Sequence, residues 1–327
     1  MRRTAVAHGL AVNPPPGRLA LLVLMLLLCT SVRGECGEAL PLSPVDVSPR
    51  VEPLSFPDIR WTSLAPGFEV GLCALPESLR ILSGAVFVIL RIAPESHDFS
   101  LSMSSEAGAA LSFAGWSLRS GLRAGINASM YLPDNSTSTG YMRSGVLLNN
   151  SRIGSNLGAF FVAGKQRGTG ARAGIIERDS PDWRNRLERY SIVVQNYRLL
   201  DNEGTLLWPR SGSVNSIAAI STDAAGRIVF ILCQEPLTVE RFANRLKELP
   251  LSLSTVMYVE GGAQAGLFVR IDEDENMPSA FAGASPYAVA GGVIHVWKGR
   301  KSLLNTRGNP DAPIPNVIGV KRDEKKK

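Results

Sequence analysis

Two carboxylates are the first residues to consider for chemistry. Glu260 ends the apolar segment 255–260 and is followed at once by Gly261 and Gly262, where a backbone can approach a ligand closely. Partial burial there would raise the pKa of Glu260 and suit an acid/base role; the alternative is a carboxylate that caps the amides of the Gly-Gly turn. Asp134 lies in a polar loop, either as a second functional carboxylate or as part of the turn itself.

Amide, phenol and guanidinium groups lie at the ends of other apolar segments. Asn127 could bind a hydroxyl or phosphate oxygen of a ligand, or it could be a satisfied amide of the core. Gln195 and Asn196 could act in the same way. Arg198 is the best phosphate ligand nearby, unless strand alternation turns it to solvent. Tyr131 could stack on a sugar ring or belong to the core.

Metal and thiol chemistry are disfavoured, and no cofactor is implied. The chain after residue 34 contains only His97 and His295, and it has no C-x-x-C motif. Cys233 lies within an apolar run, which predicts a buried free thiol. Cys36 and Cys73 either pair in an oxidising compartment or remain reduced.

The charge of the 327-residue chain is concentrated at its ends. Residues 1–34 carry four arginines and no acid, and 321–327 carry a net +3, so the formal +6 leaves −1 for 35–320. A protein that binds nucleic acid through its phosphates needs a basic body. The composition therefore argues against a nucleic-acid partner.

The N-terminal region is typical of a secretory signal. An apolar run over 19–29 follows arginines and precedes small residues, which predicts a signal peptide over 1–34 with cleavage after Gly34. The run is shorter than the roughly 20 residues that span a bilayer as a helix. We therefore expect an exported protein, periplasmic or extracellular, with an uncleaved inner-membrane tether as the alternative and as its only membrane contact. A proline-rich lead-in over 35–67, a domain over 68–320 and a basic tail over 321–327 would follow.

The elements that must position these side chains are mainly strands. Apolar, β-branched runs predict buried strands over 85–92 and 227–233, with further strands over 122–131, 158–164, 190–196, 214–221 and 255–260. A helix is expected after Pro236 with Thr238 as its N-cap, and a shorter one over 108–120 with Trp116 on its apolar side. Many strands and few helices predict a single α+β domain with mixed, mostly antiparallel sheets.

Several segments together resemble the phosphodiester glycosidase family. Segment 124–140 is similar to the family's Asn-Gly-Gly-Met-Tyr/Phe motif with an Asp seven residues after the Asn, matched by Asn127, Met130, Tyr131, Asp134 and Gly140. The resemblance continues, in order, through 158–161, 193–204, 226–251, 258–269 and 313–320, and is nearest to a bacterial exported branch. It implies an α+β fold and hydrolysis of a sugar-1-phosphodiester in an envelope or extracellular glycan.

The resemblance also implies roles for individual residues. It makes Glu260 and Asp134 the catalytic pair, as hydrolysis of a glycosidic bond commonly uses two carboxylates. The substrate would be a carbohydrate or sugar phosphate, bound by Asn127, Tyr131, Gln195, Asn196, Arg198, Gly261 and Gly262. The chain departs from the family pattern at Ser129, Ala159 and Glu260, and it lacks an Arg at 214–216. The alternative function is accordingly a non-catalytic glycan-binding or envelope scaffolding module on the same fold.

Overall fold

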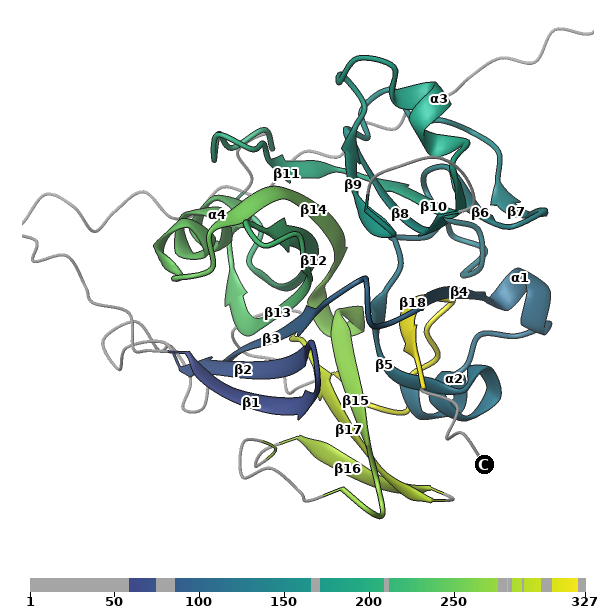
Figure 1. Ribbon diagram of the computed structural model, residues 1–327, viewed down its shortest axis with the longest axis vertical. Helices are drawn as coiled ribbons and strands as arrows, with labels where there is room; N and C mark the ends of the chain where they lie inside the picture. Colours follow the sequence, from purple (N-terminus) through teal and green to yellow (C-terminus); the bar gives the residue numbers. More distant parts are fainter. Residues whose placement is uncertain are drawn as a thin grey trace, which may run out of the picture. The chain divides into compact units, whose positions relative to one another are not determined.

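Three antiparallel sheets make up most of the protein (Figure 1). The computed structural model describes residues 59–74, 86–165, 171–208, 212–275, 281, 284–289, 291–300 and 308–322. The expected signal peptide, most of the lead-in and residues 323–327 lie outside the described residues.

The largest sheet contains the strands that carry most of the sequence-predicted apolar runs. The predicted strands over 85–92, 227–233, 214–221 and 255–260 are confirmed within one or a few residues. The first strand lies inside the segment 35–67, for which little regular structure was expected. In spatial order the seven strands are β1 (Arg60–Ala65), β2 (Phe68–Ala74), β3 (Val86–Ile92), β13 (Ile228–Leu237), β12 (Asn215–Asp223), β14 (Leu253–Gly261) and β11 (Arg198–Leu200).

Two smaller sheets complete the strand framework. One has five strands in the order β7 (Leu147–Asn150), β6 (Met142–Ser144), β10 (Tyr190–Asn196), β8 (Ala159–Lys165) and β9 (Ala173–Glu177). The other has six, in the order β16 (Ser285–Val289), β17 (Gly292–Lys298), β15 (Gly266–Asp272), β5 (Leu122–Asn127), β18 (Asn316–Lys321) and β4 (Phe99–Met103). The predicted strand 122–131 ends at Asn127, because β18 begins at Asn316 and offers its last backbone acceptor to Ala128.

Each sheet turns one face toward a core that all three share. In β3, Val88 and Leu90 belong to this shared core, whereas Phe87 and Ile89 point to the opposite face, as the two-residue period of a strand requires. Short helices cover the outer faces (Figure 1). The helices are α1 (Ser104–Ala107), α2 (Phe113–Ser120) on the six-stranded sheet, α3 (Trp183–Leu187) on the five-stranded sheet and α4 (Val239–Glu248) on the seven-stranded sheet.

The helix predicted after Pro236 is confirmed, and the one predicted over 108–120 is shorter than expected. Thr238 Oγ1 accepts a hydrogen bond from the Arg241 amide (3.2 Å), which caps α4. Gly108 has a left-handed φ of 82° and ends α1. Leu111 then pairs with Ile314 as an isolated bridge, and α2 starts behind its own cap, Ser112. Trp116 is buried as expected, and its Nε1 donates to Ile314 O (2.7 Å).

The fold is thus α+β in the broad sense, but strands dominate it. Every pair of described strands is antiparallel, and the helices serve as covers for single sheet faces. No helix in the described part of the chain is long and apolar enough to cross a bilayer. Cys233 is a buried thiol whose pKa is raised by burial, as predicted, whereas Cys36 lies outside the described residues, so its pairing with Cys73 stays a prediction.

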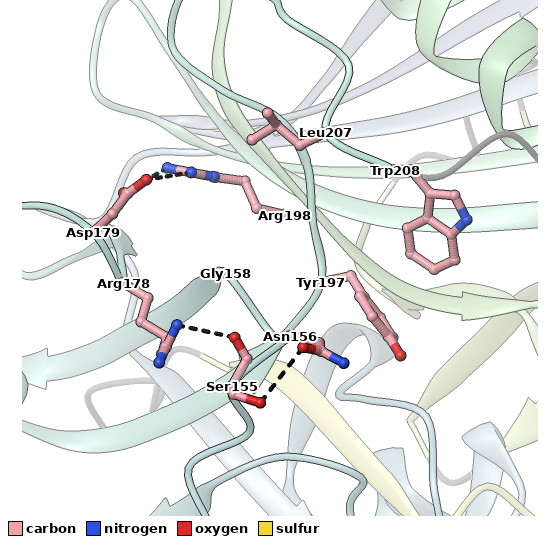
Figure 2. A pocket seen from close by; sticks show the side chains of 9 residues that line it. All are labelled: Ser155, Asn156, Gly158, Arg178, Asp179, Tyr197, Arg198, Leu207 and Trp208. Atoms are coloured by element: carbon pink, nitrogen blue, oxygen red, sulfur yellow. Dashed lines mark hydrogen bonds and ion pairs between the residues drawn. The ribbon is translucent and has the colours of Figure 1, made fainter.

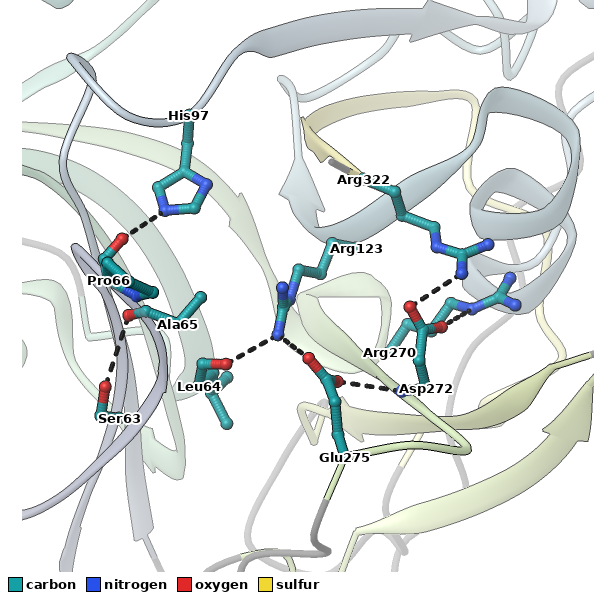
Figure 3. Close-up of polar contacts among 10 residues, drawn as sticks. All are labelled: Ser63, Leu64, Ala65, Pro66, His97, Arg123, Arg270, Asp272, Glu275 and Arg322. Carbon is teal, nitrogen blue, oxygen red and sulfur yellow. Dashed lines mark hydrogen bonds and ion pairs between the residues drawn. The ribbon is translucent and has the colours of Figure 1, made fainter. Parts of the chain in front are cut away.

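A polar network of buried and half-buried side chains ties the edge of the seven-stranded sheet to the six-stranded one (Figure 3). Arg123 of β5 donates to Leu64 O of β1 (2.8 Å) and pairs with Glu275, whose other oxygen accepts from the Asp272 amide (3.0 Å). Asp272, at the end of β15, accepts from Arg270 Nε (3.0 Å) and Arg322 Nη2 (2.7 Å). These charges are paired with one another, which indicates a structural role.

Candidate functional site

Glu260 is aimed into the protein by an irregularity in β14. Ala218 of β12 pairs with Glu260, but the next residue, Ala219, pairs with Tyr258, so Val259 is an extra residue in the strand. Such β-bulges bend a strand and re-aim a side chain, and they are frequent beside active sites. Directly opposed residues share a face, and Ala218 belongs to the core between the sheets. The bulge therefore points Glu260 toward that interior.

The Glu260 carboxylate has one anchored oxygen and one free oxygen. Its Oε1 accepts a hydrogen bond from the Gly261 amide (2.9 Å), while its buried Oε2 has no hydrogen-bond partner. The residue is only 8% exposed, and burial raises the pKa of the carboxyl to about 7, although the Gly261 hydrogen bond and the Lys298 charge oppose the shift. The capping role and the acid/base role considered from the sequence thus fall on different oxygens.

Lys298 places a buried cation near this carboxylate. It ends β17, is 3% exposed, and donates from Nζ to Gln264 O (2.8 Å) above the ring of Phe113. Burial lowers the pKa of the ammonium to about 8, and the Glu260 charge works against that shift. The two groups therefore feel each other's charge inside the protein.

The turn after Glu260 requires glycine at two positions. A Cβ on Gly261 would lie 2.2 Å from the hydroxyl of buried Tyr258, and Gly262 has a φ of +71°. The turn continues as a short 3₁₀ helix, η2 (Gly262–Gln264). Gln264 itself is half-buried, yet its Oε1 is fully covered and has no hydrogen-bond partner. A second acceptor without a partner therefore lies in the turn that begins with Glu260.

Asn127 supports this turn from β5. Its Nδ2 donates to Gln264 O (3.1 Å), and its Oδ1 accepts from the Gly266 amide (2.7 Å). Both ends of the amide are satisfied, which matches the core-amide interpretation of the sequence. Asn127 therefore positions the turn through its backbone, and its known contacts leave ligand binding by this residue as a prediction.

Gln195 and Asn196 at the end of β10 hold backbone segments in place. Asn196 Nδ2 donates to the carbonyl of Val259 (3.3 Å), the extra residue of the β14 bulge. Gln195 accepts from the Gly154 amide (2.8 Å) and donates to Leu157 O (2.7 Å). The Asn196 amide therefore stabilises the bulge that aims Glu260, and the Gln195 amide fixes the loop that contains Gly154 and Leu157.

Tyr131 and Asp134 come from one loop but have different surroundings. Tyr131 is half-buried, and the pKa of its phenol is raised by burial and by the charge of Glu260, which places it near that carboxylate. Asp134 is exposed and accepts hydrogen bonds from the amides of Ser136 (3.0 Å) and Thr137 (2.9 Å). Hydrogen bonds from Thr137 lower the pKa of Asp134. These contacts are the turn chemistry considered from the sequence, and they do not bring Asp134 to Glu260.

Arg198 lies in a separate cavity of about 540 Å³ (Figure 2). Its guanidinium is paired with Asp179 through two hydrogen bonds (2.8 and 2.5 Å) and with Glu177 (3.0 Å). Glu260 does not line this cavity. The link is Tyr258, whose ring lies 4.9 Å from that of the lining residue Trp208 and whose hydroxyl faces Gly261. The unpartnered carboxylate oxygen that could react is therefore at Glu260, outside the cavity that contains Arg198.

Lys298 and Gln264 are site residues that sequence reasoning missed. A signal for Lys298 exists in the segment 292–298, where Ile294, Val296 and Lys298 occupy alternate positions. The first two pack against Phe113 in the core under α2, so the lysine continues a buried face. No comparable signal marks Gln264, because its environment depends on the three-dimensional path of the turn.

Comparison with known proteins gives a family and two fold relatives. The family model for phosphodiester glycosidases matches residues 120–321. A hypothetical protein from Synechocystis has a similar fold, with a TM-score of 0.50 and 12% identity over 81% of this chain and 64% of that chain. The catalytic domain of zebrafish N-acetylglucosamine-1-phosphodiester alpha-N-acetylglucosaminidase, auto-inhibited by its pro-peptide, also has a TM-score of 0.50, with 10% identity over 81% and 82% of the two chains. No curated protein matches the sequence.

The two structural matches are too distant in sequence to show more than the fold. The family match covers more than half of the chain and includes the bulge, the glycine turn, Asn127 and Lys298. The resemblance inferred from the sequence motifs is confirmed, and the chain belongs to the phosphodiester glycosidase family.

Proposed function

We propose that the protein hydrolyses a sugar-1-phosphodiester, with Glu260 as the group that handles the proton. The observation that carries the proposal is the geometry of this carboxylate, with one oxygen fixed by the Gly261 amide and the other buried without a partner. A pKa near 7 makes the group an efficient base at neutral pH. Buried polar atoms without partners are rare and call for an explanation, and a bound substrate or water supplies one.

In this mechanism Glu260 Oε2 accepts a proton from a water that attacks the anomeric carbon. The bond from that carbon to the phosphate oxygen breaks, and the phosphate leaves as a monoester of its other alcohol. In the same step the Lys298 ammonium, which is coupled to Glu260 by charge, stabilises the negative charge that builds up on the leaving phosphate. A phosphate leaving group relaxes the need for a proton donor, so a second carboxylate beside Glu260 is not required.

Lys298 offers a replacement for an arginine of the family pattern. Many members have that arginine in the segment that corresponds to 214–216, where this chain has none. Ser216 is buried at that position, and its Oγ accepts from the Arg300 amide. A fixed ammonium is a common phosphate ligand, although it acts as a point charge where arginine offers a two-pronged fork. We assign the phosphate contact to Lys298.

The substrate is proposed to be an envelope or extracellular glycan, because residues 1–34 have the pattern of a secretory signal. An exported hydrolase meets such glycans after it leaves the cytoplasm. Recovery of the mature protein and sequencing of its N-terminus test this part of the proposal, which predicts a chain that starts at residue 35.

Hydrolysis by the purified protein and by Glu260→Gln tests the activity. The glutamine keeps an oxygen that can accept from the Gly261 amide but cannot take up a proton, so we expect kcat on a sugar-1-phosphodiester to fall at least about a thousandfold. Glu106→Gln changes an exposed glutamate of α1 and should leave turnover unchanged. Wild-type protein that binds glycans but hydrolyses none of a panel of sugar-1-phosphodiesters would instead identify a binding module.

A further inference from the structure

We infer that the cavity beside Trp208 is a binding site for an uncharged sugar ring, on the glycan part of the substrate away from the bond that is cleaved. The inference rests on the proposed function for its biological context, but binding in the cavity can be measured without turnover. The cavity has a volume of about 540 Å³, within the range of about 300–1,000 Å³ found for small-ligand sites. Nothing in the chemistry proposed for Glu260 uses it.

One wall of the cavity is aromatic. Trp208 and Tyr197 are half-buried, and their ring centroids lie 4.5 Å apart with the planes tilted by 56° (Figure 2). Rings of this kind offer a rigid apolar surface together with a polar edge. The C–H face of a sugar packs on such a surface, while its hydroxyl groups need polar partners around the rim.

The other wall provides those polar partners. Arg198 and Asp179 extend a two-pronged hydrogen-bonded pair at one side, and Arg178 holds Ser155 O (2.9 Å) at another, with Asn156 beside it (Figure 2). Carboxylate, amide and guanidinium groups each have several donor or acceptor positions. The donor and acceptor positions that make no contact within the protein can bind two adjacent hydroxyl groups of a sugar ring.

The charge balance decides between a sugar and a phosphate in this cavity. Two arginines line it, and the carboxylates of Asp179 and Glu177 balance their charge. Both carboxylates contact Arg198 and occupy the guanidinium positions that a phosphate would need there, while Arg178 donates to Ser155 O (2.9 Å). Arg198 was considered as a phosphate ligand from the sequence, and its pairing favours a neutral ligand instead.

Tyr258 lies between the lining of the cavity and the Glu260 turn. The Tyr258 amide donates to Tyr197 O (3.0 Å), and the Tyr258 ring contacts Trp208, while its hydroxyl lies against Gly261. Only Tyr258 therefore separates the Trp208 ring from the turn that carries Glu260. The arrangement fits a substrate whose sugar chain continues beyond the phosphate-linked residue.

Binding of three neutral disaccharides, cellobiose, maltose and chitobiose, tests this inference. Saturation-transfer NMR and tryptophan fluorescence titration would be run on the full protein and on Glu260→Gln, with glucose 1-phosphate as the charged probe. We expect at least one disaccharide to bind to both proteins with the same Kd. Trp208→Ala should weaken that binding at least tenfold and Trp208→Phe less than Trp208→Ala, because phenylalanine keeps a ring.

Trp183→Ala is the matched control, since Trp183 is also a half-buried tryptophan but stacks on Phe160 away from the cavity. It should leave Kd unchanged, and circular dichroism would show whether each variant is folded. The inference is overturned if none of the three disaccharides binds, if glucose 1-phosphate alone binds at Trp208, or if folded Trp208→Ala keeps the wild-type Kd. If a disaccharide binds at Trp208 but the protein hydrolyses none of the sugar-1-phosphodiesters in the panel, the proposed function is refuted and the sugar site still stands.

Discussion

The turn at Glu260 and the cavity at Arg198 differ in how their polar groups are paired. At the turn, Glu260 Oε2 and Gln264 Oε1 are buried without partners, and a buried lysine lies nearby with its pKa lowered to about 8. In the cavity, both Nη atoms of Arg198 are held by carboxylates at hydrogen-bond distances, and its Nε alone is buried without a partner. The unpartnered oxygens at the turn cost folding free energy. The ion pairs of Arg198 in the cavity offset the cost of burying its charge.

This difference separates the role of a reacting group from that of a recognition surface. An unpaired, partly neutralised carboxyl can exchange a proton with a substrate, which a carboxylate locked in an ion pair does poorly. A paired guanidinium and carboxylate keep a fixed shape that suits recognition of hydroxyl groups. The comparison predicts that removing charge should stabilise the protein at the turn and destabilise it at the cavity.

The largest effect on stability is expected for Glu260→Gln. The folded-state pKa of Glu260 lies near 7, above its usual value of 4.5, so the folded protein favours the protonated carboxyl. The contribution of Glu260 to the free energy of unfolding is complete below pH 4.5, where the carboxyl is protonated in both states. It is lost as the pH rises through 7. Glutamine does not ionise, so the variant should be more stable than wild type by up to about 3 kcal/mol at pH 8 and nearly equal at pH 4. Urea unfolding at both pH values measures this.

The loss of attraction to Lys298 in that variant makes 3 kcal/mol an upper bound. Glu106→Gln, at an exposed position, should change the free energy of unfolding by less than about 0.5 kcal/mol at either pH. A Glu260→Gln variant that is less stable than wild type at pH 8 would show that the carboxylate is paired, and it would remove the contrast between the two regions.

A smaller effect of opposite sign is expected for Arg198→Met. The Arg198 side chain is 14% exposed, and its loss would leave Glu177 without its cation. We expect a destabilisation of about 1 kcal/mol, which high salt should reduce. Arg172→Met removes the matched surface pair with Asp98 and should have almost no effect on unfolding. Arg198→Met with unchanged or increased stability would contradict the interpretation of the cavity as a preformed paired surface.

The strands and the α4 helix could be predicted from the sequence because their signals are local. The apolar runs in β3 and β13 are long, and Thr238 precedes an apolar repeat of helical period. The edge strand β1 was missed because its residues are exposed or half-buried and form no apolar run, and its pairing with β2 leaves no such signal in the sequence. The helix predicted over 108–120 was too long because Leu111 pairs with Ile314, which is distant in the sequence, and Ser112 caps a helix that begins at Phe113.

The site was predictable in part for a related reason. Glu260 and its glycines form one contiguous motif, so the sequence was enough to find them. The bulge that aims Glu260 depends on pairing between β12 and β14 and on a hydrogen bond from Asn196. Lys298 comes from a strand 38 positions further along the chain and meets Glu260 only through the packing of two sheets. Asp134 as the catalytic partner stays a prediction, because its hydrogen bonds from the Ser136 and Thr137 amides match the turn role that the sequence left as the alternative.

The pH dependence of kcat/KM for wild type and Lys298→Met tests the central claim, that Glu260 and Lys298 together form the reacting centre. For wild type we predict a rise as Glu260 ionises near pH 7 and a fall as Lys298 loses its proton near pH 8, with both midpoints belonging to the coupled pair. Lys298→Met should lose the falling limb, lower kcat/KM about a hundredfold and shift the rising limb to higher pH. A flat wild-type profile between pH 6 and 9, or an unchanged falling limb in folded Lys298→Met, would contradict the claim.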